Sequence, residues 1–390
     1  MKIFKLKDIS EFIRNGVTIK QDISSKEGIP ITRIETISKG TIDFNKLGYA
    51  NIFKIEKYKE WLLKKGDILI SHINSEKHLG KSAIYLDNNY DIIHGMNLLC
   101  IRAIDKKVFP EYLQLFFKTN QYKKQIKKIT KKSVNQASFS VNDFKEILIT
   151  VPDLNIQEKI IKKIKVLEKI LENNKLKLNY LSELTKSLFT RMFGDIKSND
   201  KNWKIYKFSE KLKISSGGTP SKANKIYWKN GTISWIGSNM CNDEIITKND
   251  GKFITEEGLK NSSAKIYKMN TVIVALVGAT IGKTGLLKFE TSTNQNIAAL
   301  EIKNMDYSPE FLFFLLQNLY YKFTELGGDT FKMANLSFIK NLPLISPPIE
   351  LQNKFAERIE KIEKLKFEIE KSIEESQKLY NSLISKYFDN

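Results

Sequence analysis

Two long segments with the same hydrophobic spacing constrain the fold of this chain more than any other feature of its sequence. In each segment, apolar residues recur at alternating steps of four and three over five heptads, and no proline or glycine interrupts the run before Gly194. This spacing is typical of a coiled-coil seam. The first seam is Ile160, Ile164, Leu167, Leu171, Asn174, Leu178, Leu181, Thr185, Leu188 and Met192; the second is Phe355, Ile359, Ile362, Lys366, Ile369, Ile373, Ser376, Tyr380, Leu383 and Tyr387.

The two seams share one frame because the second half of the chain repeats the first. Pro152-Asp153-Leu154-Asn155-Ile156-Gln157 matches Pro347-Pro348-Ile349-Glu350-Leu351-Gln352, and the same offset relates Phe193 to Phe388. A weaker echo relates Pro110-Glu111 to Pro309-Glu310. The repeat predicts four segments: a globular domain at 1–152, a long helix at 153–194, a second globular domain at 195–348 and a second long helix at 349–390.

We expect the two long helices to pair with each other as an antiparallel coiled coil, although two unrelated amphipathic helices would show similar spacing. Asn174 falls in the seam, where a polar residue fixes register at some cost in stability. As a helix, residues 155–191 would span roughly 55 Å, or about 16 base pairs of B-DNA. An antiparallel pair would make the chain pseudo-twofold and suit two separated DNA half-sites. The predicted fold class is α+β: two mixed α/β domains in tandem, joined by this coiled coil.

The charge of the chain favours a polyanionic partner. Its 390 residues include 64 Lys and Arg against 44 Asp and Glu, a net charge of +20, and the globular parts carry most of the excess. A lysine-rich composition without a nucleic-acid partner is the alternative. We expect no transmembrane helix, no secretory signal and no disulfide framework, because apolar runs are short and Cys100 and Cys241 lie far apart. These features favour a cytoplasmic protein.

The globular parts are expected to mix strands and helices. Residues 67–71 and 271–277 are short β-branched runs that predict buried strands, and Pro110–Lys118 and Pro309–Leu319 predict helices with proline in the first turn. The polar stretches Ser215–Asn224 and Asn230–Asn242 predict loops.

No motif in the sequence predicts catalysis or metal binding. The segment from Gly278 to Thr284 has three residues between its glycines, where a phosphate-binding loop needs four. His72 and His78 lack the spacing of a zinc helix. Ser346-Pro347-Pro348-Ile349 lacks the acidic and aromatic ends of an amino-methyltransferase motif.

Basic and amide side chains in both halves are the candidates for contacting DNA. Lysines anchor phosphates, whereas Asn, Gln, Ser and Thr can hydrogen-bond to base edges. The densest basic cluster runs from Lys118 to Lys132, and it has no basic counterpart in the second half. The candidates are Lys77, Lys81, Lys123, Lys124, Lys127, Lys128, Thr219, Ser221, Lys222, Asn239, Lys283, Thr284, Asn294 and Gln295.

The ordered set of motifs resembles the specificity (S) subunit of type I restriction-modification systems over essentially the whole chain. The resemblance rests on Ser216-Gly217-Gly218-Thr219-Pro220-Ser221 before Tyr227-Trp228 and Trp235, on Thr293-Asn294-Gln295, and on the two copies of Pro-x-[Leu/Ile]-x-x-Gln. The first half departs from it, with no Gly-Gly-Thr-Pro near Gly16 and His94-Gly95-Met96-Asn97 in place of Thr293-Asn294-Gln295-Asn296.

This resemblance implies a chain without catalysis or cofactor of its own. Each target-recognition domain would read half of a bipartite DNA site, and the paired helices would act as spacer and dock for two adenine-methyltransferase (M) subunits. Motor-nuclease (R) subunits would join for cleavage. S-adenosylmethionine would belong to M, and ATP and Mg²⁺ to R. Two other readings remain: a coiled-coil scaffold with incidental basic charge, and a stand-alone DNA-modifying enzyme.

Overall fold

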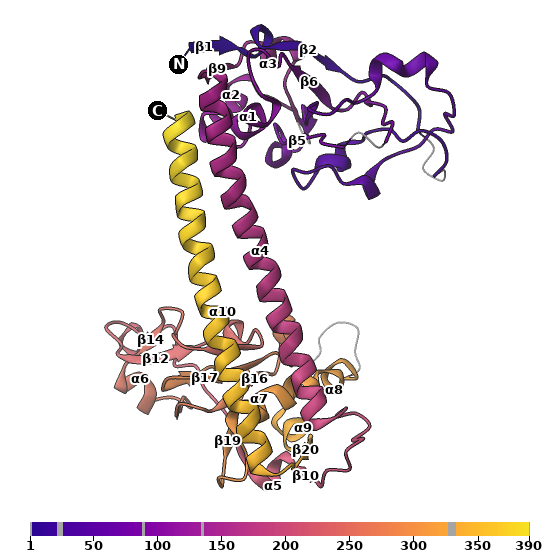
Figure 1. Cartoon of the computed structure of the whole chain (residues 1–390). Helices are drawn as coiled ribbons and strands as arrows, with labels where there is room; N and C mark the ends of the chain where they lie inside the picture. Colours follow the sequence, from indigo (N-terminus) through magenta and orange to yellow (C-terminus); the bar gives the residue numbers. More distant parts are fainter. Residues whose placement is uncertain (1, 22–25, 88–89, 134–135, 327–332, 390) are drawn as a thin grey trace. The chain divides into compact units, whose positions relative to one another are not determined.

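The computed structural model describes residues 2–21, 26–87, 90–133, 136–326 and 333–389 (Figure 1). The chain divides into two compact units, one formed by Met1–Lys175 with Glu370–Asn390 and the other by Leu176–Ile369. Met1, the first residue of the first predicted segment, and Asn390, the last residue of the last one, lie outside the described residues.

The first unit is built on an antiparallel sheet of four strands in the order β2-β6-β3-β5. Its central strands are short; β3 is fully buried, as expected for an apolar run between turns, and β6 is buried except at Arg102. A separate antiparallel pair, β1 with β9, joins the two ends of the globular part. The strands are β1 (Lys2–Lys5), β2 (Ser10–Asn15), β3 (Ile68–Ile70), β4 (Ile73–Asn74), β5 (Ser82–Ile84), β6 (Leu99–Ala103), β7 (Lys131–Lys132), β8 (Ala137–Ser138) and β9 (Leu148–Val151); the short helices are α1 (Pro110–Phe116), α2 (Asn120–Ile129) and α3 (Val141–Lys145).

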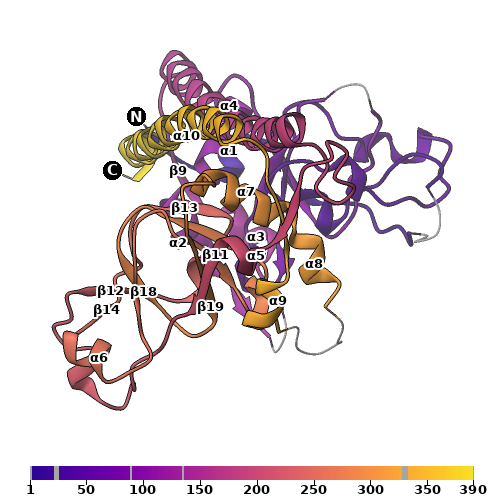
Figure 2. The same cartoon turned by 90° about the horizontal axis from the view of Figure 1, so that it is seen from below.

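The second unit repeats this arrangement and extends it. Its larger sheet has the order β11-β19-β16-β17-β13, in which β13 pairs parallel with β17, and β10 pairs with β20 as β1 pairs with β9. Strands β12, β14 and β18 and helix α6 gather in one lobe of this unit (Figure 2). The strands are β10 (Ile205–Lys207), β11 (Leu212–Ser216), β12 (Ile233–Ile236), β13 (Glu244–Ile246), β14 (Phe253–Ile254), β15 (Ile266–Tyr267), β16 (Val272–Ala275), β17 (Thr284–Leu287), β18 (Thr291–Thr293), β19 (Ile297–Ile302) and β20 (Pro343–Ile345); the short helices are α5 (Phe208–Lys211), α6 (Glu256–Lys260), α7 (Pro309–Asn318), α8 (Tyr320–Thr324) and α9 (Leu336–Lys340).

The predicted strands and proline-led helices are present as β3, β16, α1 and α7. The prediction of a loop over Asn230–Asn242 was wrong, because strand β12 occupies Ile233–Ile236. This strand is four residues long and lies between polar residues, so its apolar signal is weak, and it forms through long-range pairing with β14 and β18. Likewise, Ser215 and Ser216 end strand β11 and do not belong to a loop.

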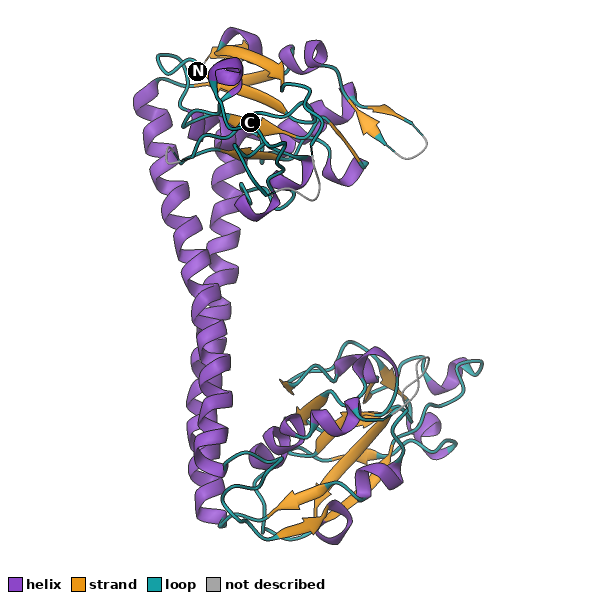
Figure 3. Cartoon of the chain, turned by 90° about the vertical axis from the view of Figure 1, so that its right-hand side faces the viewer, coloured by secondary structure: helices purple, strands orange, loops and turns teal. Residues whose placement is uncertain are grey.

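The predicted antiparallel pairing of the long helices α4 (Leu154–Phe193) and α10 (Ile349–Ile384) is confirmed (Figure 3). In the first unit, Asn174 Nδ2 donates to Ser372 Oγ at 3.0 Å, and the Tyr380 hydroxyl donates to Glu168 Oε1 at 3.5 Å. In the second unit, the ring centroids of Phe189 and Phe355 are 5.6 Å apart. From Glu168 to Asn174 along α4, the partner on α10 moves back from Tyr380 to Ser372, which is the antiparallel sense.

Each globular core is closed by an aromatic residue at the end of α4 or in the π-helical turn Ser385–Asp389 that follows α10. In the first unit, Phe388 is 2% exposed and lies 4.8 Å from Tyr112, measured between ring centroids. In the second unit, Phe193 is 1% exposed and lies 4.7 Å from Phe311. The sequence repeat that relates Phe193 to Phe388 therefore preserves the packing of an aromatic residue on the proline-led helix of each globular part, α1 or α7.

Candidate nucleic-acid interface

A lysine-lined cavity of about 500 Å³ lies in the first unit, beside helix α2. Lys123 and Lys127 line it with Tyr122 and Ile126, because residues three and four apart share a helix face. The side chain of Thr119 caps the helix by accepting a hydrogen bond from Tyr122 N. The cavity is lined by Glu76, Lys77, Leu79, Gly80, Lys81, Phe117, Tyr122, Lys123, Ile126, Lys127, Thr130 and Lys132.

The cavity brings together four of the six candidate lysines of the first half: Lys77, Lys81, Lys123 and Lys127. The other two, Lys124 and Lys128, are exposed on α2 but do not line it. Lys81 is tethered, because its Nζ donates to the Ser38 carbonyl oxygen at 3.0 Å. The arrangement concentrates positive charge at a concave surface, which suits a phosphate backbone.

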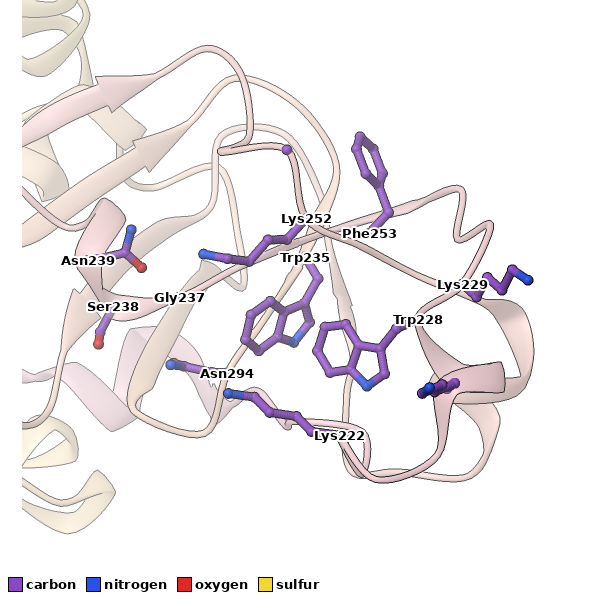
Figure 4. Close-up of a pocket in the computed structure, with 12 residues that line it drawn as sticks. Lys222, Trp228, Lys229, Trp235, Gly237, Ser238, Asn239, Lys252, Phe253 and Asn294 are labelled. Atoms are coloured by element: carbon purple, nitrogen blue, oxygen red, sulfur yellow. The ribbon is translucent and has the colours of Figure 1, made fainter.

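A larger cavity of about 850 Å³ lies in the second unit, between the segment after β11 and strands β12 and β14 (Figure 4). It brings together the candidates Lys222, Asn239 and Asn294 with Trp228 and Trp235. These residues are far apart in the sequence, and the pairing of β12 with β14 and β18 assembles them. Lys225, Lys229, Lys252 and Phe253 also line the cavity, and sequence reasoning missed them. The lysine spacing at 222, 225 and 229 was the available signal.

The glycine-rich loop and the Thr293-Asn294-Gln295 segment, which were separate in the sequence, lie against each other. Gly218 N donates to the Thr293 carbonyl oxygen at 2.8 Å, and Thr219 Oγ1 donates to Gln295 Oε1 at 2.5 Å. A side chain at Gly217 would collide with Thr293, so the close approach requires glycine there. The loop is also tied to the tryptophans: the indole N–H of Trp235 donates to the Gly218 carbonyl oxygen at 3.0 Å.

The first unit contains the same close approach without the second half's motif. A side chain at Gly16 would collide with the backbone of His94 and Gly95, and Val17 N donates to the His94 carbonyl oxygen at 2.9 Å. The sequence difference at Gly16 and at His94-Gly95-Met96-Asn97 therefore changes the exposed chemistry of this contact but keeps its backbone geometry.

Two candidates of the second unit are engaged internally. Thr284 is 0% exposed, and both its backbone N–H and its hydroxyl donate to Asp243 Oδ1, at 3.0 and 3.1 Å. The prediction that Thr284 contacts DNA is therefore wrong. The sequence indicated a turn after a strand, whereas Thr284 is the first residue of strand β17. Lys283 forms an ion pair with Asp243 at 2.5 Å and lies over the Tyr320 ring, so it does not project freely into solvent.

The glutamine of each Pro-x-[Leu/Ile]-x-x-Gln motif anchors a long helix to its globular part. Gln157 is 0% exposed; its Oε1 accepts from Phe109 N at 2.9 Å, and its Nε2 donates to the carbonyl oxygens of Lys107 at 3.0 Å and Pro152 at 2.8 Å. Gln352 is also 0% exposed and makes the equivalent three bonds, to Ser308 N, Asp306 O and Pro347 O, at 3.0, 3.2 and 2.9 Å. The motif therefore has a structural role in both units.

The seam positions predicted on both helices are buried or half-buried, and none is exposed. Asn174 is 7% exposed and satisfies its amide through Ser372. Around the seam, several large apolar side chains face outward: Val166 is 59% exposed, Tyr180 70%, Leu184 51% and Phe367 67%.

His72, His94 and both cysteines are buried. Burial lowers the pKa of His72 and of His94 to about 4, so both are neutral near pH 7. Burial raises the pKa of the Cys241 thiol to about 12, which leaves it unreactive. Within the described parts of the chain, no three His, Cys, Asp or Glu side chains cluster as a metal site would need, and no helix is long and apolar enough to cross a membrane.

Comparison with known proteins defines the class that this architecture belongs to. The sequence matches the type I restriction modification DNA specificity domain twice, over residues 1–181 and 200–378. It is 30% identical over 386 residues to the putative type I restriction enzyme MjaX specificity subunit of Methanocaldococcus jannaschii, covering 93% of this chain and 87% of that one. The MjaIX specificity subunit of the same organism is 23% identical over 301 residues, covering 72% and 68%.

The fold agrees with this relationship. The crystal structure of the S subunit of a type I restriction-modification system from M. genitalium superposes with a TM-score of 0.65 at 14% identity, covering 99% of this chain and 96% of that one. The chain therefore belongs to the family of type I restriction-modification DNA specificity subunits. As such it is the non-catalytic, DNA-binding part of a restriction enzyme complex, and the family carries no cofactor. The alternatives of a scaffold and of a stand-alone enzyme are set aside.

Proposed function

We propose that each globular part reads one half of a bipartite DNA target, while α4 and α10 set the gap between the halves and dock two M subunits. The four parts of the chain then take the boundaries 1–152, 153–194, 195–348 and 349–390. The observation that carries the proposal is the repetition of one strand order, β2-β6-β3-β5 and β11-β19-β16-β17, with a lysine-lined cavity in each unit.

The DNA contacts are divided by chemistry. In the first unit, Lys77, Lys123 and Lys127 hold phosphates, and Lys124 and Lys128 extend the basic surface of α2. In the second unit, Lys222 holds phosphates, and Asn239, Asn294, Gln295, Thr219 and Ser221 supply groups for base edges. Lys81 and Lys283 contribute charge from fixed positions. Because the two cavities have different side chains, the two half-sites are different sequences.

The M subunits dock on the outward apolar side chains of the long helices. Val166 and Ile170, one helical turn apart, form one such patch in the first unit, and Tyr180 and Leu184 form another in the second. Burial of these side chains gives a hydrophobic interface. R subunits join the M-bound complex for cleavage, S-adenosylmethionine belongs to M, and ATP and Mg²⁺ belong to R. We place this activity in the cytoplasm, where chromosomal DNA is accessible.

Sequencing of methylated DNA from a host that expresses this chain with its M subunit tests modular reading. Exchange of residues 1–152 for those of a relative should change one half of the methylated target and leave the other half and the gap intact. A change in both halves would contradict modular reading.

The length of the helices is tested by a paired deletion. Residues 176–182 follow Asn174 on α4, and residues 364–370 precede Ser372 on α10. Their removal takes one heptad from each helix and keeps the bond between Asn174 and Ser372. The helices shorten by about 10 Å, so the gap in the target should lose about three base pairs. Removal of 176–182 alone mismatches the two seams and serves as the control, which should abolish methylation. An unchanged gap in the paired deletion would refute the spacer role.

A further inference from the structure

The cavity between the segment after β11 and the paired strands β12 and β14 is larger than a protein needs to contact the edge of a base pair. Its volume of about 850 Å³ falls in the range of about 300–1,000 Å³ that encloses a drug-sized ligand. A stacked base pair presents only its edge to a protein, through a few polar groups and the thymine methyl group. The cavity can hold a whole nucleotide.

The centre of the cavity is aromatic. The ring centroids of Trp228 and Trp235 are 5.2 Å apart, and the rings are nearly perpendicular, at 84°. Both indole N–H groups point to loop carbonyl oxygens, that of Trp228 to Ser221 at 3.2 Å and that of Trp235 to Gly218 at 3.0 Å. The surfaces left to face the cavity are therefore carbon surfaces, on which a nucleobase stacks well (Figure 4). Phe253, 39% exposed, adds an apolar side chain to the rim.

The rim of the cavity carries four lysines, three of which have no carboxylate partner among the described residues. Lys222, Lys225 and Lys229 are exposed and line the cavity, and none of the three pairs with a carboxylate in the described residues. The fourth lysine, Lys252, is paired with Asp250 at 2.5 Å. Three unpaired ammonium groups around an aromatic centre match the phosphates that flank a base.

Amide groups complete the lining. Ser238, Asn239 and Asn294 lie on the side of Trp235 away from Lys229 (Figure 4). Asn294 Oδ1 accepts from Asn296 N at 3.1 Å, and its Nδ2 donates to no described residue at hydrogen-bonding distance. An asparagine amide can pair with the edge of a base through one donor and one acceptor.

We propose that this pocket binds one nucleobase of the target DNA that has left the helical stack. The base stacks on Trp228, the lysines at 222, 225 and 229 hold the adjacent phosphates, and Asn239 and Asn294 hydrogen-bond to its edge. Trp228 thereby holds the base by stacking, which any base allows, and the two asparagines are the specificity-determining residues because they contact its edge. This inference rests on the proposed reading of a half-site by the second unit.

The test uses the assembled complex of this chain with its M subunit and a duplex that carries the methylated target. 2-Aminopurine replaces each purine of the second half-site in turn, and permanganate oxidation reports unstacked thymines. The wild-type complex should show one unstacked base besides the adenine that is methylated. Trp228→Leu should remove that signal, leave the adenine signal, and weaken binding roughly 5- to 100-fold, as loss of one stacked base does. Trp228→Phe, which keeps an aromatic ring, should retain both.

Ile226→Ala is the matched control, because Ile226 is 62% exposed beside the pocket but does not line it; it should behave as wild type. Lys225→Ala with Lys229→Ala gives a second variant that leaves the aromatic centre intact and should also weaken the signal. Specific binding by every variant with no extra unstacked base would overturn the inference but leave the proposed function standing. Failure of the wild-type complex to prefer a bipartite target would instead overturn the proposed function. If free deoxynucleotides bind and quench the fluorescence of Trp228 while the bound duplex stays fully stacked, the pocket belongs to a small molecule. That result would also overturn the inference.

Discussion

Replacement of Gln157 by methionine should release the central helix from the first globular part. Methionine keeps the length and most of the volume of the side chain but removes three hydrogen bonds, from Phe109 N and to the carbonyl oxygens of Lys107 and Pro152. Because Gln157 is 0% exposed, the abandoned groups of the neighbouring backbone do not all regain water. Each lost bond costs about 0.5–1.5 kcal/mol, and a buried group left without a partner costs about 1–3 kcal/mol.

The expected loss is about 3 kcal/mol, because the Phe109 N–H lies at the start of α1 with no other cap and the Lys107 carbonyl can be rehydrated at an exposed residue. Such a loss raises the opening equilibrium of the affected region roughly a hundredfold. Hydrogen exchange of the full-length chain measures it region by region, which avoids treating a two-unit protein as a single unfolding transition. Exchange should accelerate in α1 and in the first turns of α4.

The chain supplies its own control. Gln352→Met breaks the equivalent bonds of the second unit, so its effect should appear in α7 and the first turns of α10 and leave α1 unchanged. Asn155→Ala, at an exposed position of the same helical turn as Gln157, should have little effect. Acceleration below threefold in Gln157→Met, or acceleration equal in both units, would refute the anchoring role.

Three further predictions concern the seam, pH and salt. Asn174→Leu should raise the melting temperature, because it replaces a polar residue of the seam, but it should loosen the register that the bond to Ser372 fixes. Cysteine cross-linking between α4 and α10 should then give several products in place of one. A single cross-linked product would contradict this role of Asn174. His72 and His94 have pKa values lowered to about 4 in the folded chain, so the unfolded chain binds protons first as the pH falls below 6.5. The first unit should therefore lose about 2 kcal/mol of stability per histidine by pH 5. The second unit, whose sequence contains no histidine, should not lose stability in this way. Hydrogen exchange at pH 7 and pH 5 would measure this, and equal losses in both units would argue against it. The double variant Lys123→Ala, Lys127→Ala should weaken DNA binding by the M-bound complex without changing the target sequence. The slope of the logarithm of the binding constant against the logarithm of the salt concentration should fall in magnitude by about 1–2. An unchanged slope would show that these lysines do not contact phosphates.

The sequence by itself determined the architecture, because its signals are local. Four-three spacing fixes which face of each long helix is apolar, and two seams of equal length in one frame have each other as the nearest partner. The repeat around Pro-x-[Leu/Ile]-x-x-Gln likewise marked where each globular part ends. The anchoring role of its glutamines was not predictable, since four of their six hydrogen-bond partners lie 44 to 50 residues earlier in the chain.

Only the tertiary structure decided which side chains form a surface. Lys222, Trp235, Phe253 and Asn294 meet because β12 pairs with both β14 and β18, and no spacing in the chain encodes that pairing. The same pairing made a strand of Ile233–Ile236, where the sequence indicated a loop. Thr284 shows the converse: its polar side chain suggested a DNA contact, but the residue is buried in strand β17 and its hydroxyl donates to Asp243. Local periodicity sets the direction of side chains along an element, whereas contacts distant in sequence decide which of those directions reach solvent.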